Sequence, residues 1–226
     1  MDRLIVVFDL DDTLYPEITY VLSGFNAVAE HLSVEHGLPK AKVGRELREI
    51  LKRDGRGAVF NQVLENHGLL TKARVRKLVS VYRSHTPRIK LPEESAQVLR
   101  ACAAYPLYLV TDGNHRVQKR KVDALKVAPF FDHCYLTRRY GIDAEKPSLK
   151  VFNLIAERER VPMSSLVYIG DNPAKDFVGL RRAGGNTIRV LTGAYAATAA
   201  RRGFDADSTI QSVGEVPERL SQLAIQ

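Results

Sequence analysis

The stretch Arg3-Leu-Ile-Val-Val-Phe-Asp9-Leu-Asp11-Asp-Thr13-Leu-Tyr15 decides the fold. Its apolar half, Leu4 to Phe8, is a continuous run typical of a strand buried on both faces of a parallel sheet. Its polar half begins where that strand ends, at the edge where open α/β sheets bind ligands. Side chains alternate along an extended chain, so the sequence predicts Asp9 and Asp11 on one side of the strand end.

Two neighbouring carboxylates repel each other unless a positive charge lies between them. A hard divalent cation with oxygen ligands meets that need. The alternative is an acidic turn that caps the next helix, and the matching polar clusters further along the chain favour the cation.

The composition is that of an ordinary folded protein. The chain has 226 residues, 45% hydrophobic and 27% charged, which suits one domain with an insertion or two small ones. No apolar run is long enough to cross a bilayer, and the start shows no signal-peptide pattern. Cys102 and Cys134 lack metal-ligand spacing and are expected as reduced core residues. The expected location is the cytoplasm, away from membranes.

The chain is basic, with a net charge of +8 and a pI near 9.5. This charge suits an anionic partner, either nucleic acid or a small phosphorylated substrate. The basic residues are scattered, and their densest short stretch, Lys119-Arg120-Lys121, is expected to form one solvated helix face. Because no nucleic-acid motif is present, a small phosphorylated metabolite or a surface charge without a specific role is favoured.

Helical spacing of apolar residues dominates the segment from Pro16 to Pro87 and predicts four helices there. From Leu91 onward, strands are predicted at 107–111, 133–137, 166–169 and 187–190, with helices between them. This alternation predicts an α/β fold, a three-layer parallel sheet covered by helices on both faces. The expected organisation is a core of residues 1–15 and 88–226 with an all-helical insert at 16–87.

Four polar clusters follow one another along the core. They are Asp9-Leu-Asp11-Asp-Thr13, Thr111-Asp112-Gly113-Asn114, Lys146-Pro147 and Gly170-Asp171-Asn-Pro-Ala-Lys-Asp176. Their order, DxDxT, Thr-Asp-Gly, Lys-Pro and GDxxxxD, resembles the haloacid dehalogenase superfamily. The resemblance implies that family's Rossmann-like core, and the helical insert resembles the C1-type cap of its subfamily I phosphatases.

The resemblance also implies a chemistry for the first cluster. Asp9 would be the nucleophile that forms an aspartyl-phosphate, and Asp11 the general acid and base. Mg²⁺ would be held by the Asp9 carboxylate, the Asp11 backbone carbonyl and the Asp171 carboxylate. Thr13 would support the turn.

The remaining clusters would bind phosphate and balance charge. Thr111 and the backbone N–H of Gly113 or Asn114 would hold phosphoryl oxygens, and Lys146 would hold Asp9 against phosphate. Asp176 would orient Lys146 or a metal-bound water. The plainer alternatives are a surface lysine for Lys146, a strand-end hydrogen bond for Thr111 and an early-helix carboxylate for Asp176. Asp112 is expected as an exposed turn residue.

Asp11 separates the chemistries of this superfamily. Dehalogenases generally lack a carboxylate two positions after the nucleophile, because halide leaves without a proton. Its presence favours a phosphatase, with a phosphomutase or a dehalogenase as alternatives. A non-enzymatic nucleic-acid-binding protein is a further alternative, but it predicts a degraded catalytic set.

Several classes of substrate are consistent with the resemblance. The resemblance implies a small phosphate monoester, namely a nucleotide, flavin mononucleotide or a sugar phosphate, and a nucleotide is favoured slightly. Arg56, in a glycine-rich turn of the insert, is a candidate for substrate specificity, and Tyr15 is a candidate for flanking the pocket.

Overall fold

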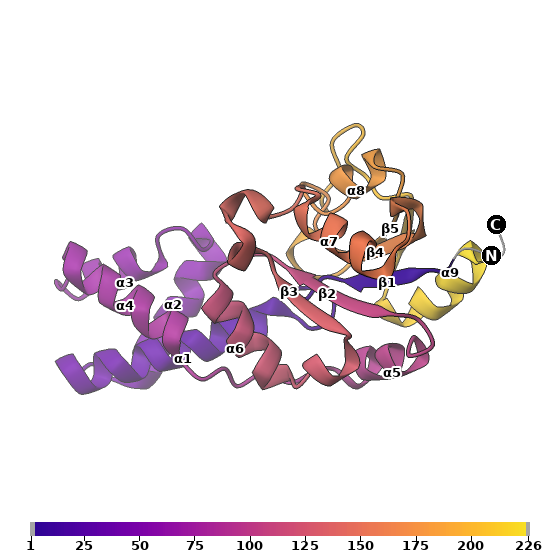
Figure 1. The fold of residues 1–226 in the computed structure, drawn as a ribbon. Helices are drawn as coiled ribbons and strands as arrows, with labels where there is room; N and C mark the ends of the chain where they lie inside the picture. Colours follow the sequence, from indigo (N-terminus) through magenta and orange to yellow (C-terminus); the bar gives the residue numbers. More distant parts are fainter. Residues whose placement is uncertain (1–2, 225–226) are drawn as a thin grey trace. The chain divides into compact units, whose positions relative to one another are not determined.

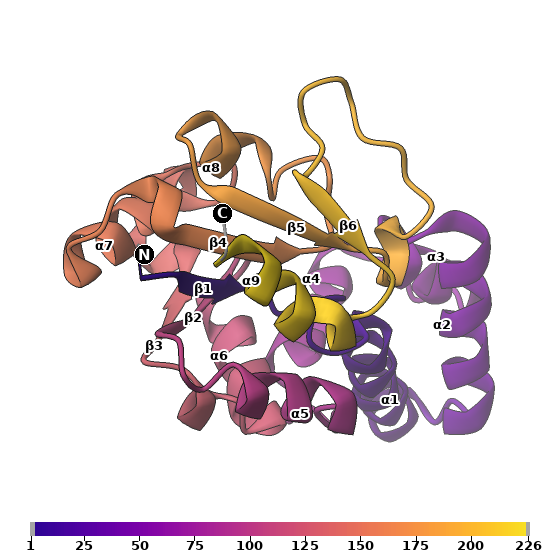
Figure 2. The same cartoon turned by 90° about the vertical axis from the view of Figure 1, so that its right-hand side faces the viewer.

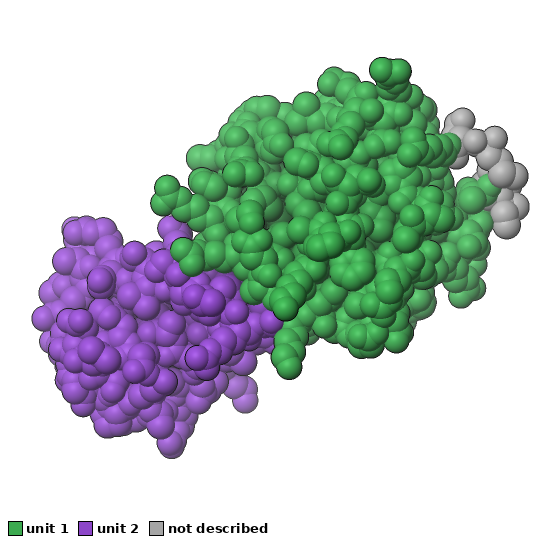
Figure 3. Space-filling model, turned by 60° about the horizontal axis from the view of Figure 1, so that its bottom comes forward, with its two compact units in different colours: residues 1–17, 90–226 green, residues 18–89 purple. Residues whose placement is uncertain are grey.

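The computed structural model describes residues 3–224, and its contacts divide the chain into two compact units. One unit holds residues 1–17 and 90–226, and the other holds residues 18–89 (Figure 3). Each boundary lies two residues beyond the one expected for the insert. We refer to the first as the sheet unit and to the second as the helical unit.

A six-stranded parallel sheet forms the centre of the sheet unit (Figure 1). The strand order is β3-β2-β1-β4-β5-β6. Their bounds are β1 Ile5–Phe8, β2 Leu107–Thr111, β3 His133–Leu136, β4 Leu166–Gly170, β5 Asn186–Val190 and β6 Ser208–Ile210. The central strands β1, β2 and β4 are buried along their whole length, as their continuous apolar sequences predict.

Register brings three of the polar clusters to one edge of this sheet. Phe8, the last residue of β1, pairs with Leu109 of β2 and with Ile169 of β4. Asp9 therefore leaves the sheet beside the ends of both neighbouring strands. Because all three strands run parallel, their carboxyl ends meet at the same edge.

Helices cover both faces of the sheet (Figure 2). Helices α7 and α8 lie on one face, and α5, α6 and α9 lie on the other. The bounds are α5 Glu93–Ala101, α6 His115–Leu125, α7 Lys150–Glu159, α8 Val178–Arg182 and α9 Val216–Leu223. The α7 face is packed by Phe152 and Ile155 against Val7 and Tyr168, all almost fully buried. Short 3₁₀ turns occupy Ala128–Phe130, Thr137–Tyr140, Ile142–Ala144, Met163–Ser165, Gly193–Tyr195 and Val213–Glu215.

The helical unit contains most of α1 and three further helices around its own apolar core. The bounds are α1 Glu17–His36, α2 Lys40–Asp54, α3 Val59–Asn66 and α4 Lys72–Ser84. Phe25, Leu32, Leu47 and Leu64 are among the buried residues at helical spacing that form this core. Thr71 caps α4: its side-chain oxygen accepts a hydrogen bond from the Arg74 backbone N–H.

The structure confirms the predicted three-layer α/β sheet with helices on both faces. The prediction missed one strand, β6, because its three residues Ser208-Thr-Ile210 are too few and too polar to show a strand pattern. Short edge strands of this kind are held by pairing, here with β5, rather than by their own sequence.

Candidate active site

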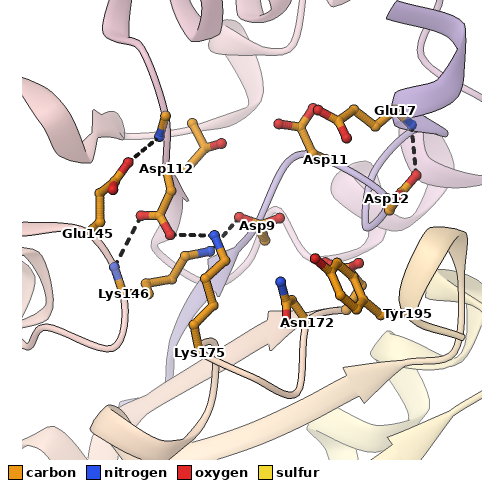
Figure 4. A pocket seen from close by; sticks show the side chains of 13 residues that line it. Asp9, Asp11, Asp12, Glu17, Asp112, Glu145, Lys146, Asn172, Lys175 and Tyr195 are labelled. Carbon is orange, nitrogen blue, oxygen red and sulfur yellow. Dashed lines mark hydrogen bonds and ion pairs between the residues drawn. The ribbon is translucent and has the colours of Figure 1, made fainter. Parts of the chain in front are cut away.

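The three strand ends and the loop lysine converge on one cavity of about 290 Å³ in the sheet unit (Figure 4). The residues that line it come from segments far apart in the sequence. They are Asp9, Asp11, Asp12, Glu17, Thr111, Asp112, Gly113, Glu145, Lys146, Asp171, Asn172, Lys175 and Tyr195. The sequence clusters therefore form one site.

Lys146 lies at the centre of the buried charges. Its Nζ is 2.6 Å from Asp9 Oδ1 and 2.9 Å from Asp176 Oδ1, and it also donates to the Tyr168 hydroxyl oxygen. Burial alone would lower the pKa of Lys146, but the charges of Asp176 and Asp9 outweigh burial and hold that pKa well above its usual value. Lys146 is thus a fixed cation beneath Asp9 and not a surface lysine.

Asp176, which pairs with Lys146 through one carboxylate oxygen, is also held through the other. Its Oδ2 accepts a hydrogen bond from the Asn172 backbone N–H at 2.9 Å, within the turn that follows β4. Asp176 is 2% exposed. The geometry places it where it can orient Lys146, and it does not line the cavity.

Asp171 is a buried carboxylate that forms no ion pair with the residues described. It is 4% exposed, and within residues 3–224 no hydrogen bond or ion pair reaches its carboxylate oxygens. Burial and the negative charges of Asp9 and Asp176 raise its pKa to about 9. Carboxylate oxygens of Asp9, Asp171 and Asp176 lie within 4.8 Å of one another. This oxygen-only donor set fits a hard divalent cation.

The raised pKa of Asp171 predicts a pH-dependent stability when divalent cations are chelated. Between the ordinary value of 3.8 and about 9, the native carboxyl keeps a proton that the unfolded chain has lost. The free energy of unfolding in EDTA should therefore fall as pH rises through this range, by up to about 1.4 kcal/mol per pH unit. Urea unfolding of the wild type and of Asp171→Asn checks this: the variant should lose less stability with pH, whereas parallel curves would contradict it.

Asp11 lines the same cavity, but its carboxylate is surrounded by hydrogen-bond donors of its own. Lys121 Nζ on α6 lies 2.8 Å from both Asp11 carboxylate oxygens, the Tyr15 hydroxyl donates at 2.7 Å, and Gln118 Nε2 donates at 2.8 Å. Lys121 also pairs with Glu17 at 3.2 Å. Burial would raise the pKa of Asp11, but the Lys121 charge and these hydrogen bonds lower it overall. Asp11 is therefore held as a carboxylate.

Two expectations near Asp11 were wrong. Lys121 does not belong to a solvated helix face, because its side chain is only 3% exposed. Its positions relative to Gln118, Val122 and Leu125 put it on the buried face of α6. Tyr15 does not flank the cavity: it is buried behind Asp11 and holds that carboxylate by its hydroxyl.

The residues of the cluster Thr111-Asp112-Gly113-Asn114 do not all face the cavity, because one of them caps a helix instead. Thr111 lines the cavity, and its hydroxyl oxygen accepts a hydrogen bond from Gln118 Nε2. Gly113 also lines it, but its backbone N–H donates to Glu145 Oε1 at 2.9 Å. Asn114 lies outside the cavity lining and caps α6 by accepting from the Arg116 and Val117 N–H groups. Glu145 was not expected at the site.

Asp112 is not the exposed turn residue that was expected. Its side chain is 8% exposed and accepts hydrogen bonds from the Thr137 hydroxyl at 2.9 Å and the Lys146 backbone N–H at 3.2 Å. The second carboxylate oxygen lies 2.6 Å from Lys175 Nζ. Asp112 thus joins three of the polar clusters, a role that only the three-dimensional fold reveals.

The turn after Asp11 is fixed by the loop that follows β5. Asp12 has a φ of 56°, a left-handed conformation that aspartate tolerates better than most residues. Its carboxylate accepts hydrogen bonds from the Glu17 and Ala194 N–H groups, at 2.8 and 3.2 Å. Thr13 is buried beside it, and within the described residues its hydroxyl makes no hydrogen bond. This loop also brings Tyr195 to the cavity.

Arg56 lies in the helical unit, in the turn between α2 and α3. Its contact with substrate stays a prediction. Both cysteines carry free thiols, Cys102 buried and Cys134 half-buried, and burial raises the pKa of each to about 11. Among the residues described, no helix is long and apolar enough to span a membrane.

The amino-acid sequence is similar to those of two named phosphatases. The chain is 28% identical over 200 residues to the glyceraldehyde 3-phosphate phosphatase of Methanopyrus kandleri, covering 84% of each chain. It is also 28% identical over 205 residues to the enzyme of that name from Methanocaldococcus jannaschii, covering 84% of this chain and 86% of the relative.

A solved HAD-hydrolase of Bacillus subtilis bound to magnesium shares the fold. Its TM-score is 0.67 at 18% identity, over 97% of this chain and 99% of that one. A family model for haloacid dehalogenase-like hydrolases matches residues 4–184, which include all four polar clusters. The chain therefore belongs to the haloacid dehalogenase-like hydrolase family.

Proposed function

We propose that the protein is a Mg²⁺-dependent phosphatase that hydrolyses a small phosphate monoester through a phosphorylated Asp9. The observation that carries the proposal is a second carboxylate, Asp11, lining the same cavity as Asp9. Halide leaves carbon without a proton, whereas an alkoxide leaving phosphorus needs one. The relatives at 28% identity that are named as phosphatases support the same choice.

The reaction divides into two displacements at phosphorus. Asp11 first takes up a proton from solvent, against its low pKa, and in this acid form is a strong proton donor. An Asp9 carboxylate oxygen then forms a bond to phosphorus, while the bond from phosphorus to the alcohol oxygen breaks and that oxygen takes the proton from Asp11. Water then attacks the phosphorus of the aspartyl-phosphate and passes a proton to Asp11. The Asp9 carboxylate and inorganic phosphate are released.

The donor groups suit a cation beside Asp9. The carboxylates of Asp9 and Asp171 and the backbone carbonyl of Asp11 would hold Mg²⁺, with Asp176 behind them. When bound, the cation would neutralise charge between the carboxylates and a phosphate dianion. The buried Asp171 carboxylate, without a hydrogen bond or ion pair among the described residues, supports this assignment.

Other residues position the phosphoryl group. Because the Thr111 oxygen accepts a hydrogen bond from Gln118, its own O–H is left to donate to a phosphoryl oxygen. Lys146 holds Asp9 in place and offsets the negative charge that gathers during the displacement. The Gly113 N–H can join them once Glu145 moves away.

The helical unit is proposed as a cap that selects the leaving group, with Arg56 as a candidate contact. The named relatives favour a sugar phosphate such as a triose phosphate over the nucleotide suggested by the resemblance.

Asp11→Asn distinguishes the role of this carboxylate. Turnover of an alkyl phosphate should fall by about 10² to 10⁴-fold, because its leaving alkoxide needs a proton. Turnover of p-nitrophenyl phosphate should fall much less, since p-nitrophenolate is a stable anion. Steady-state rates on both substrates with Mg²⁺ test this, and equal losses on the two would rule out the acid role.

The function itself is tested by phosphate release from a panel of sugar phosphates, nucleotides and flavin mononucleotide, with Mg²⁺ and with EDTA. Release from one compound class, lost in EDTA, would support the proposal and name the class. Absence of release from every compound in Mg²⁺ would count against a phosphatase.

A further inference from the structure

The cavity has an unfavourable charge balance for a phosphate dianion. Seven carboxylates line it, whereas only two lysines, Lys146 and Lys175, do so among the residues described. Lys146 is already committed to Asp9 and Asp176, at 2.6 and 2.9 Å. Lys175 is therefore the cation of this cavity that is not assigned to the reaction.

Lys175 is placed to reach the reacting centre. It belongs to the turn after β4, where its backbone N–H donates to the Asn172 carbonyl, so the base of the side chain is fixed. Figure 4 shows the side chain extending between Asp112 and Asp9. The positive charge of Lys175 also acts to lower the pKa of Asp9, against the effect of burial, which agrees with this proximity.

The ion pair between Lys175 and Asp112 can open without disturbing Asp112. Its ammonium lies 2.6 Å from Asp112 Oδ2, but the side chain is still 36% exposed. Asp112 keeps two other donors, the Thr137 hydroxyl and the Lys146 N–H, on its other oxygen. The ammonium can therefore turn from Asp112 to an anion in the cavity while the Asp112 carboxylate stays in place.

We propose that Lys175 is a substrate-binding residue whose ammonium contacts the phosphoryl group. This proposal rests on the proposed function and adds to it a second phosphate-binding lysine. An ammonium group gains more from a phosphate dianion than from a carboxylate, since the dianion carries twice the charge.

The test is the binding of inorganic phosphate, measured by calorimetry in Mg²⁺, to the wild type and three variants. Lys175→Met should weaken phosphate binding by about 10- to 100-fold, the usual effect of losing one charged hydrogen bond. Lys175→Arg should recover part of the loss. Lys150→Met is the matched control, because Lys150 also pairs with an aspartate, Asp143, but does not line the cavity; it should bind phosphate as the wild type does.

Turnover separates phosphate binding from contact with the leaving group. Lys175→Met should lower kcat/KM by a similar factor for a sugar phosphate and for p-nitrophenyl phosphate, because both present the same phosphoryl group. Unchanged phosphate affinity in Lys175→Met, or no phosphate binding by the wild type, would overturn the proposal. If the wild type binds phosphate through Lys175 but hydrolyses no phosphate monoester, the proposed function is wrong, whereas the proposed anion site at Lys175 is still supported.

Discussion

Replacing Asp9 by asparagine is expected to reduce turnover by at least about 10⁴-fold, as for other enzymes that lose their nucleophile. The amide cannot form the bond to phosphorus. Asp9 follows a strand that is fully buried, and asparagine has nearly the same volume, so the fold should remain. Steady-state phosphate release and the far-ultraviolet circular dichroism of the variant check both statements.

A matched control comes from the surface of α6. Asp123 forms an exposed ion pair with Lys119, and Asp123→Asn should retain wild-type turnover. Substantial turnover in a clean preparation of Asp9→Asn would mean that another group attacks phosphorus.

Lys146→Met is expected to impair both stability and turnover. The substitution leaves Asp9 and Asp176 buried without their shared cation, and breaking a buried pair in this way costs about 3 to 5 kcal/mol. Loss of the cation also raises the pKa of Asp9, so less of the nucleophile is ionised near pH 7. Turnover should fall by about 10² to 10³-fold, and its pH profile should move to higher pH.

Urea unfolding and pH–rate profiles measure these effects. Lys119→Met, which removes an exposed pair, should change stability by no more than about 0.5 kcal/mol. The double variant Lys146→Met with Asp176→Asn should regain part of the lost stability, because it removes one of the two buried carboxylates that Lys146→Met leaves without a cation. If Lys146→Met matched the control in both stability and turnover, Lys146 would be neither a structural nor a functional cation.

The fold was predictable because its decisive signals are local. The continuous apolar run that contains Ile5 to Phe8 indicates a strand buried on both faces, and the change to helical spacing after Pro16 marks the start of the insert. The polar strand ends follow from the parallel sheet, since its topology gathers Asp9, Thr111 and Asp171 at one edge. β6 carries no such signal and depends on its neighbour.

The site residues that belong to a sequence motif were predictable, whereas the contacts that arise from tertiary packing were not. Lys121 stands in a basic run, yet it lies three residues after Gln118 and four before Leu125, the spacing of the buried face of α6, and this spacing was a usable signal. Asp112 and Lys175 meet across 63 positions of sequence, and no spacing rule indicates such a pair. The placement of Glu145 on the Gly113 N–H likewise depends on how two loops fold together.

The measurement that tests the central claim most directly is the identification of the phosphorylated residue. The enzyme is mixed with a hydrolysed substrate and Mg²⁺, quenched in acid during turnover, digested and analysed by mass spectrometry. We expect the mass of one phosphoryl group on the peptide that contains Asp9, and its absence when EDTA is present. A phosphoryl group on any other side chain would contradict the account.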